Sequence, residues 1–297
     1  MSRSLHTTLI DLVDVISERA QKGGIDIVGI PTGFPDFDRV TSGLRKKSLY
    51  YIVGRTGMGK TALALSFAYN IAKAGKNILF LSLEMDAELL ALRALAMHTG
   101  IPSDRIERGQ LNKEEVIAVQ NVLTITEKFH FQVVDEPIDS ERFTNSIEKY
   151  QQRHGLDLLF VDYASLFRDI AKNSENERLG RISANLLTCA KVCSIPVVAI
   201  AQLNREVEKR ENHVPILSDI RDSGSIEQDG FLVLAAYRPH YYRQMFDGEP
   251  PLEIEEAEIK ILKNRQGEVG TIRVLYKPAQ TLWLPRTVEV KQPKKVS

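Results

Sequence analysis

The sequence contains little of what would place it in a specialised class of proteins. Cysteine occurs twice in 297 residues, and the six histidines are scattered without the spacing of metal ligands. Cys189 and Cys193 would lie on neighbouring turns of one helix as small buried side chains, whereas a zinc site would need two more ligands. A chain of this length can bury a large core, so neither disulfides nor a structural metal are expected to hold the fold together.

Net charge and long hydrophobic runs are also absent. The 39 basic and 39 acidic residues cancel, which excludes a global basic field but still allows nucleic acid to bind at a local loop or in an oligomer channel. No apolar stretch approaches the roughly 18 residues that indicate a membrane-spanning helix. Asp11 and Asp14 interrupt the N-terminal segment, which makes it a poor signal peptide. We therefore expect a cytoplasmic protein without membrane contacts.

Apolar, strand-like runs alternate with helical segments along most of the chain. The runs cover residues 49–53, 77–83, 131–134, 156–161, 196–201 and 231–237. Fully apolar strands that alternate with helices are typical of a parallel sheet covered on both faces. Residues 257–285 alternate instead as antiparallel hairpins do. The sequence therefore predicts an α/β fold with a mainly parallel sheet, helices on both faces and a C-terminal antiparallel extension.

Capping residues mark several of the expected helix starts. Asp86 is expected to cap one helix, and Asn112 with Glu115 to form a capping box on the next. Ser140 is expected to cap a third helix, and Gly100 to end the helix that starts after Asp86.

The first residues of the chain predict an amphipathic helix. Leu5, Leu9, Leu12 and Ile16 recur at helical spacing, and the segment 22–24 (Lys-Gly-Gly) ends the helix in a joint. The apolar stripe either packs on the helix's own domain or docks on another subunit, and the pattern alone does not distinguish these interpretations.

A glycine-rich segment follows the first apolar run. Its residues, Gly54, Arg55, Thr56, Gly57, Met58, Gly59, Lys60 and Thr61, fit the phosphate-loop pattern G-x-x-x-x-G-K-[ST]. The glycines allow successive backbone N–H groups to point at phosphate oxygens at a helix N-terminus. Lys60 can reach the β- and γ-phosphates, and the Thr61 hydroxyl can bind Mg²⁺. The flanking strand and helix favour a nucleotide site over a glycine-rich turn with an exposed lysine.

Three other apolar runs are each followed at once by a polar residue, namely Glu84, Asp162 and Gln202. The carboxyl edge of a parallel sheet is where ligands bind, so we expect all three beside the phosphate loop. Asp162 is expected to bind Mg²⁺, whereas Asp157 is a strand-entry residue. Glu84 is either a group that orients or deprotonates water or a surface acid before a helix, and the Gln202 amide can bond to a γ-phosphate.

With these segments in view, the chain resembles the C-terminal motor domain of the DnaB family, the hexameric replicative DNA helicases of bacteria and their phages. The resemblance covers residues from about 28 to 285 and follows the family's order of motifs. It is carried by 29–34 (GIPTGF), 54–61 (GRTGMGKT), 82–85 (SLEM), 161–163 (VDY), 201–205 (AQLNR), 222–229 (DSGSIEQD) and 263–267 (KNRQG).

The resemblance implies a RecA-like P-loop NTPase core that uses ATP and Mg²⁺ to move along single-stranded DNA and unwind duplex. It makes Glu84 the catalytic base and Gln202 the residue that couples hydrolysis to movement. It also makes Lys263 and Arg265 a basic pair that reaches the ATP of a neighbouring subunit, as an arginine finger does. These two cations lie at alternate positions, at a hairpin turn that we place at the edge of the sheet. Without the resemblance, a solvated hairpin turn would be the better explanation for them.

The segment Ile220–Gly224 resembles the family's DNA-binding loop. Arg221 offers a phosphate contact there, and the backbone N–H groups of Ser223 and Gly224 can bind phosphate without reading sequence. The resemblance also implies a homo-oligomer, a hexameric ring in the full-length protein, with primase and a helicase loader as further partners. The family's N-terminal helical-hairpin domain, which binds primase, is missing here, so we interpret the chain as a motor fragment.

We expect three parts: a linker helix and joint (1–24), a RecA-like ATPase and helicase motor domain (25–288) and a flexible tail (289–297). Two other functions fit the same motifs. One is a RecA-like recombination or repair ATPase that forms filaments, and the other is a regulatory ATP-binding module with little hydrolysis. Directional unwinding would distinguish a helicase from the first, and loss of ATPase activity in Glu84→Gln would distinguish both enzymes from the second.

Overall fold

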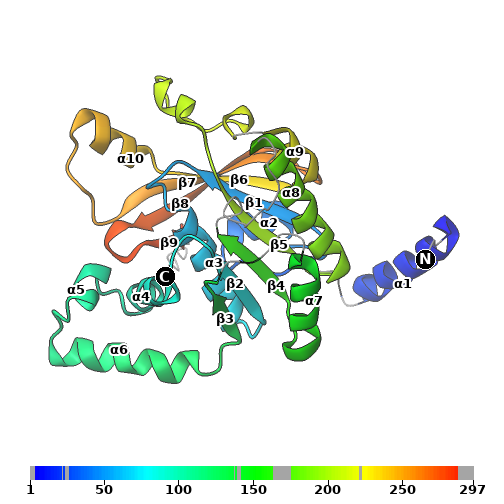
Figure 1. Ribbon diagram of the computed structural model, residues 1–297, viewed down its shortest axis with the longest axis horizontal. Coiled ribbons are helices and arrows are strands. Elements are labelled where there is room, and N and C mark those ends of the chain that lie inside the picture. Colours follow the sequence, from blue (N-terminus) through cyan, green and yellow to red (C-terminus); the bar gives the residue numbers. More distant parts are fainter. Residues whose placement is uncertain are drawn as a thin grey trace, which may run out of the picture.

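The structure, a computed structural model, has a nine-stranded sheet at its centre (Figure 1). It describes residues 4–21, 23, 27–136, 138, 142–162, 175–220 and 223–286. Across the sheet the strands are ordered β3 (Phe131–Val134), β2 (Ile78–Ser82), β4 (Leu158–Asp162), β5 (Val197–Gln202), β1 (Leu49–Gly54), β6 (Leu232–Tyr237), β7 (Glu255–Asn264), β8 (Gly270–Lys277) and β9 (Leu282–Pro285). The first six strands in this order are parallel and the last three antiparallel, as predicted.

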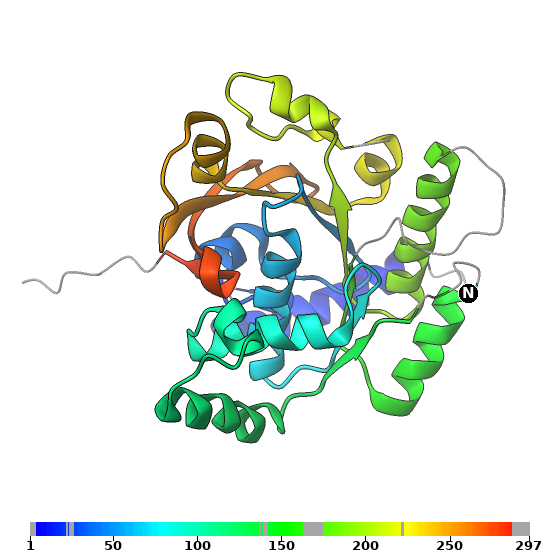
Figure 2. The same cartoon turned by 60° about the vertical axis from the view of Figure 1, so that its left-hand side comes forward.

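Helices cover both faces of the sheet (Figure 2). The α-helices are α1 (Leu5–Gln21), α2 (Pro35–Thr41), α3 (Lys60–Lys73), α4 (Ala87–Thr99), α5 (Ser103–Glu107), α6 (Lys113–Thr126), α7 (Phe143–His154), α8 (Glu175–Val192), α9 (Ser223–Asp229) and α10 (Pro239–Tyr242). Short 3₁₀ and π turns are η2 (Arg205–Lys209), η3 (Leu217–Asp219), η4 (Arg243–Asp247) and η5 (Pro278–Gln280). Helices α2, α3 and α4 pack on one face, and α7, α8 and α9 on the other.

Alternate residues of the inner strands belong to two separate cores. In β1, Tyr50 and Ile52 share a core with Phe67 of α3, whereas Tyr51 shares the other core with Leu186 of α8. All five side chains are buried. Because successive side chains of a strand point to opposite faces, a strand covered on both faces must be apolar throughout. This requirement explains the continuous apolar runs in the sequence.

Local signals predicted most helix ends correctly. The Asp86 carboxylate accepts a hydrogen bond from the Leu89 N–H at 2.8 Å, and Asn112 forms the predicted capping box with Glu115. Gly100 ends α4 in the left-handed conformation. Ser140 and the tail 289–297 lie outside the described residues. The sequence analysis missed α2, α5, α9 and α10, which are too short to show a helical period.

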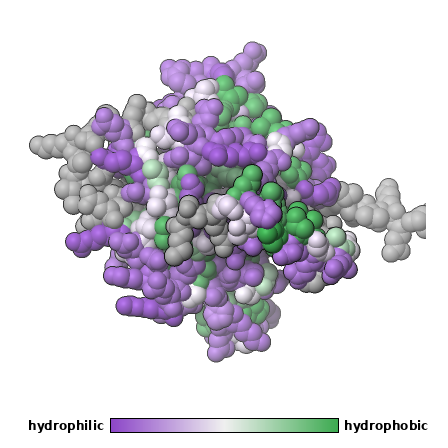
Figure 3. Space-filling view, turned by 90° about the vertical axis from the view of Figure 1, so that its right-hand side faces the viewer, coloured by the Kyte–Doolittle hydropathy of each residue, from purple (hydrophilic) through white to green (hydrophobic). Residues whose placement is uncertain are grey.

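Helix α1 projects away from the rest of the molecule and buries none of its residues (Figure 1). Its leucines and isoleucine at positions 5, 9, 12 and 16 are between 47% and 75% exposed. In the single chain, the interpretation that α1 packs on its own domain is therefore wrong. Seen from the side on which α1 projects, the surface is mainly hydrophilic with a few apolar patches (Figure 3). Within the described part of the chain, no helix is long and apolar enough to cross a membrane.

The capping box provides a test of the local structure. Asn112→Ala is expected to lower the free energy of unfolding by about 1 kcal/mol, because the Glu115 N–H loses its acceptor at the start of α6. Urea unfolding followed by circular dichroism measures the change. Asn121→Ala, at an exposed position in the middle of the same helix, is the control. An equal loss of stability in both variants would contradict the role of the box.

Candidate nucleotide-binding site

The carboxyl ends of the central parallel strands meet at one edge of the sheet. Their hydrogen-bond register aligns Gly54 with Gln202, and Ser82 with Asp162. Glu84 follows Ser82 by two residues and is exposed, so that water can reach its carboxylate. The structure therefore brings the phosphate loop to the same edge as the three polar residues that the sequence analysis placed there.

Two glycines give the phosphate loop its shape. Gly57 and Gly59 have φ angles of +82° and +80°, in the left-handed region that side chains rarely adopt. A Cβ on Gly57 would lie 2.5 Å from the Tyr241 hydroxyl, and one on Gly59 would lie 3.0 Å from the ring nitrogen of Trp283. Gly59 is the N-cap of α3, so the loop leads into a helix N-terminus whose free N–H groups favour phosphate.

Two side chains from the C-terminal part of the chain support this loop, and the sequence analysis did not identify them. Arg238 donates a hydrogen bond of 2.7 Å to the Gly57 carbonyl and forms a buried, bidentate ion pair with Glu255. Trp283 Nε1 donates to the Gly59 carbonyl at 2.9 Å. Signals were present: Arg238 directly follows β6, and Trp283 is the only tryptophan of the sequence.

Burial dominates the electrostatics of the site. It lowers the pKa of Lys60, and the nearby carboxylates of Glu84 and Asp162 act in the opposite direction. Burial also raises the pKa of Asp162 to about 6, against the effects of the Thr61 hydroxyl and Lys60. Lys60 Nζ donates to the Arg55 carbonyl at 3.2 Å. Burial thus destabilises the charged forms of Lys60 and Asp162, and a bound ligand of opposite charge would stabilise each of them.

Asp162 fits a magnesium ligand. Its carboxylate is completely buried, and neither oxygen accepts a hydrogen bond of ordinary geometry from the described residues, although the Thr61 hydroxyl is near enough to lower the pKa. Mg²⁺ commonly takes one or two protein oxygens and completes its shell with phosphates and water. In the described ranges no cluster of three or more His, Cys, Asp or Glu side chains could hold a metal. Mg²⁺ at this edge would therefore depend on the oxygens of the nucleotide.

Gln202 and Arg55 connect the phosphate loop with the segment after β5. Gln202 Nε2 donates to Thr56 Oγ1 at 3.0 Å, which places the amide against the loop. The Arg55 side chain is directed to the segment after β5, where Nε bonds to Glu208 at 2.7 Å and Nη1 to the Leu203 carbonyl at 3.0 Å. Arg55 was predicted as a nucleotide-binding residue; in this structure only its backbone remains part of the loop.

Lys263 and Arg265 lie at the other end of the sheet from the phosphate loop. Ala236 is beside Gly54 at the loop end, and β7 pairs Ala236 with Ile259. Lys263 follows Ile259 by four residues, which is ~13 Å farther along the strand. The prediction of a hairpin at the sheet's edge is met only in part. Strand β7 is an inner strand between β6 and β8, whereas β9 covers only residues 274–277 of β8 and leaves the part of β8 next to the turn at the edge of the described sheet. The two cations are too far away to serve the phosphate loop of their own chain.

Both cations instead bind the carboxyl end of α9. Lys263 Nζ donates to the carbonyls of Glu227 and Gly230, and Arg265 Nη2 donates to that of Gln228. Burial lowers the pKa of Lys263, and the neighbouring Arg265 charge lowers it further. The turn 265–270 is exposed, as the solvated-hairpin alternative expects, but both cations are bound to carbonyls of α9.

The predicted DNA-binding loop is only partly described. Ser223 and Gly224 form the first turn of α9, so the expectation of a loop at these two residues was wrong. Arg221 lies outside the described residues. Ile220, directly before it, forms an isolated antiparallel bridge with Leu203 at the end of β5.

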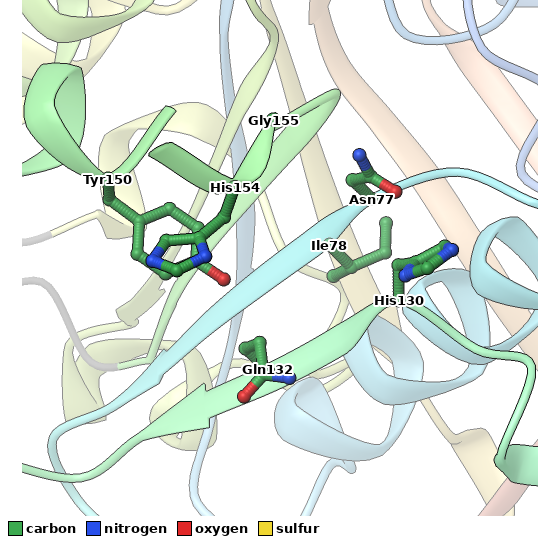
Figure 4. A pocket seen from close by; sticks show the side chains of 7 residues that line it. All are labelled: Asn77, Ile78, His130, Gln132, Tyr150, His154 and Gly155. Atoms are coloured by element: carbon green, nitrogen blue, oxygen red, sulfur yellow. The ribbon is translucent and has the colours of Figure 1, made fainter. Parts of the chain in front are cut away.

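A cavity of about 340 Å³ lies at the amino ends of β2 and β3 (Figure 4). It is lined by Asn77, Ile78, His130, Gln132, Tyr150, His154 and Gly155. Because this edge is opposite to the phosphate loop, the cavity is separate from the candidate nucleotide site.

The combination of a left-handed glycine loop, a lysine at a helix N-terminus and a strand-end aspartate defines the class of P-loop NTPases. Residues 29–283 match the family model described as DnaB-like helicase C terminal domain, and the chain therefore belongs to that family. The predicted family resemblance and RecA-like fold class are thus confirmed.

Curated relatives agree with this assignment. The chain is 34% identical over 302 residues to the replicative DNA helicase DnaB of Helicobacter pylori (strain ATCC 700392 / 26695), with 91% of this chain and 62% of that protein covered. It is 33% identical over 278 residues to replicative DNA helicase DnaB of Geobacillus stearothermophilus, with 92% and 60% covered. The chain spans about three fifths of the length of these two relatives.

Solved structures share the fold. One of them, described as an ATPase domain, superposes with a TM-score of 0.86 at 25% identity, covering 97% of this chain and 100% of that one. A structure of a DnaB-like replicative helicase and its interactions with primase gives a TM-score of 0.83 at 25% identity, covering 97% and 68%.

The raised pKa of Asp162 predicts a pH-dependent gain of stability in Asp162→Asn. Because the folded pKa of about 6 exceeds the ordinary 3.8, this carboxyl favours folding at acid pH, and that contribution is lost as pH rises through 6. The free energy of unfolding of the variant should therefore exceed that of the wild type by an amount that grows as pH rises from 4 to 6. Above pH 6 the difference should reach up to about 3 kcal/mol.

Thermal unfolding without nucleotide or Mg²⁺ measures this difference. Asp104→Asn, which removes an exposed carboxyl from α5, should show no comparable gain. In the same buffers with Mg²⁺, Asp162→Asn is expected to weaken ATP binding. A variant that is less stable than the wild type at every pH would contradict the cost assigned to this buried charge.

Proposed function

We propose that this chain is the ATP-hydrolysing motor of a replicative DNA helicase, which translocates on single-stranded DNA and separates duplex. The observation that carries the proposal is the meeting of Lys60, Asp162, Glu84 and Gln202 at the carboxyl edge of the sheet. The similarity to replicative DNA helicases supports this function over a filament-forming recombinase. We place this chain in the cytoplasm, as the sequence analysis expects.

Each polar residue at the edge has a role in this proposal. Lys60 and the loop N–H groups bind the β- and γ-phosphates, and the Thr61 hydroxyl and Asp162 carboxylate hold Mg²⁺. Mg²⁺, when bound, neutralises charge on the phosphate oxygens. Glu84 is exposed beside Lys60, and it orients the attacking water and takes its proton. Gln202, already bonded to the loop through Thr56, senses the γ-phosphate.

Hydrolysis in this proposal requires a neighbouring subunit. Lys263 and Arg265 lie far from their own phosphate loop, so they can neutralise transition-state charge only on the nucleotide of another chain. Their hydrogen bonds to α9 hold both side chains in place before assembly. A closed ring, hexameric in the full-length protein, gives every phosphate loop such a neighbour.

In this proposal, helix α1 forms the contact that holds neighbouring subunits of the ring together. Its exposed apolar stripe needs a partner surface, and an apolar hollow of about 390 Å³ lies among α3, α4, α6 and β3. Leu123, which lines this hollow, is exposed, and so is Ile117 on the same helix, α6. We assign α1 of a second copy to this surface, where each fully buried side chain contributes ~1.5–3 kcal/mol before ordering costs.

Single-stranded DNA binds near the start of α9 in this proposal. Arg221 contacts phosphates, and the backbone N–H groups of Ser223 and Gly224 add contacts that do not depend on sequence. Primase and a helicase loader are the further partners, in keeping with the structural relative described with primase.

Glu84→Gln tests the chemistry. The variant should bind ATP as the wild type does but lose hydrolysis by about 10²–10⁴-fold, together with duplex unwinding, because the amide cannot accept a proton. Radiolabelled phosphate release and strand displacement measure the two activities. Glu88→Gln, an exposed acid four residues further on, is the control and should keep both. Weakened ATP binding with normal turnover would contradict the role of Glu84, and a wild type that hydrolyses ATP without unwinding would favour the recombinase or repair alternative.

Mixing two inactive variants tests the contribution of the neighbour. Lys60→Ala lacks a working phosphate loop, and Arg265→Ala lacks the finger. A mixed ring contains interfaces with an intact loop on one subunit and an intact finger on the next, so part of the ATPase activity should return. Co-assembly is confirmed by electron microscopy, which also distinguishes rings from filaments. Normal hydrolysis by Arg265→Ala alone, or mixed rings without activity, would rule out the trans-acting finger.

A further inference from the structure

The ion pair between Arg55 and Glu208 connects the phosphate loop with the 3₁₀ turn η2. The Arg55 side chain is 10% exposed and that of Glu208 27%, and their charged atoms are 2.7 Å apart. A second Arg55 nitrogen bonds to the Leu203 carbonyl, and the Leu203 N–H in turn donates to the Gly54 carbonyl at 3.2 Å. A charge-assisted hydrogen bond with so little solvent is costly to separate, because either charge alone would remain poorly solvated. The loop and the 3₁₀ turn η2 are therefore expected to move together.

Hydrogen bonds also connect the residues directly before η2 to the residues directly before α9. Leu203 pairs with Ile220 in the isolated bridge, and the Asn204 N–H donates to the Asp219 carbonyl at 2.7 Å. The Asp219 carboxylate is largely buried and forms an ion pair with Arg210. These bonds fix Ile220, the last described residue before the proposed DNA contacts, to the segment held by Arg55.

We propose that Glu208 is a positioning residue that couples the phosphate loop to the DNA-binding segment. The inference rests on the proposed function, since it assigns a path between the two sites which that function requires. A γ-phosphate in the loop constrains the backbone of Arg55, and a shift of Arg55 displaces Glu208 through their ion pair. Because Glu208 belongs to η2, this turn moves as well and displaces Asp219 and Ile220. Gln202 contacts Thr56 in the same loop, so that the strand end and η2 respond to the same three loop residues, Gly54 to Thr56.

Glu208→Gln separates coupling from chemistry. The amide oxygen can still accept a hydrogen bond from Arg55, but the charge that holds the pair together is gone. Fluorescence anisotropy gives the Kd for labelled single-stranded DNA in the presence of ADP and of a non-hydrolysable ATP analogue. We expect the ratio of these two Kd values to fall about fivefold or more toward unity, whereas hydrolysis without DNA stays at the wild-type rate. The Tm should fall, because the Arg55 charge loses its partner. By linkage, the effect of DNA on the nucleotide Kd should shrink by the same factor.

The same turn provides a matched control. Glu206 also lies on η2 and pairs with Lys209, but its side chain is 69% exposed, so Glu206→Gln should keep the wild-type ratio. Glu208→Asp keeps the charge and should restore most of the coupling. Glu208→Asp should also restore the Tm, and Asp219→Asn, one step further along the path, must show the same loss of the ratio as Glu208→Gln.

The outcomes distinguish this inference from the proposed function. A wild type whose DNA affinity is the same with both nucleotides would contradict the helicase proposal and the coupling path together. A wild type with a clear ratio, which Glu208→Gln leaves unchanged, would overturn the role of Glu208 alone. Equal losses in Glu206→Gln and Glu208→Gln would also overturn it, because they would reflect the charge of η2 rather than the buried pair.

Discussion

Parallel strands β2, β4, β5 and β1 share one hydrogen-bond register, and the rest of the site depends on it. The register sets Asp162 beside Ser82 and Gln202 beside Gly54, so that strands from distant parts of the chain end within two residues of one another at the same edge of the sheet. A slip of one residue in such a sheet would turn every side chain to the opposite face and bury the polar residues in the wrong core. The two cores enforce the register, because each strand must satisfy both faces at once.

The antiparallel extension does more than widen this sheet. Trp283 on β9 binds the Gly59 carbonyl, and Arg238, which lies between β6 and α10, binds the Gly57 carbonyl. Arg238 is itself fixed by Glu255 on β7, with both side chains almost completely buried. The phosphate loop is thus supported by residues that follow it by about 180 to 220 positions, and its conformation does not rely on glycine flexibility alone.

The sequence predicted the parts of the site that depend on local pattern. Continuous apolar runs identified the inner strands, and the strand-end rule found Glu84, Asp162 and Gln202. Glu208 and Trp283 could not be found in this way, because their partners lie 153 and 224 positions away and no local pattern indicates which distant segments return to one place. For α1, the periodicity gave the apolar face correctly, but it contains no information about the surface that covers that face. The family resemblance supplied roles, such as that of Arg265, which neither pattern nor position could supply.

The hydrogen bonds of Lys263 and Arg265 to α9 affect how the proposed subunit interface would select its nucleotide. Three carbonyl oxygens at the end of α9 already hold these cations, so the rotational freedom of two long side chains was lost when the chain folded. In the proposed ring, a nucleotide on the next subunit has to displace these carbonyl oxygens to reach the cations. We therefore expect the proposed interface to favour a ligand that carries several negative charges at a fixed distance, and a nucleotide without its terminal phosphate to leave the cations on α9.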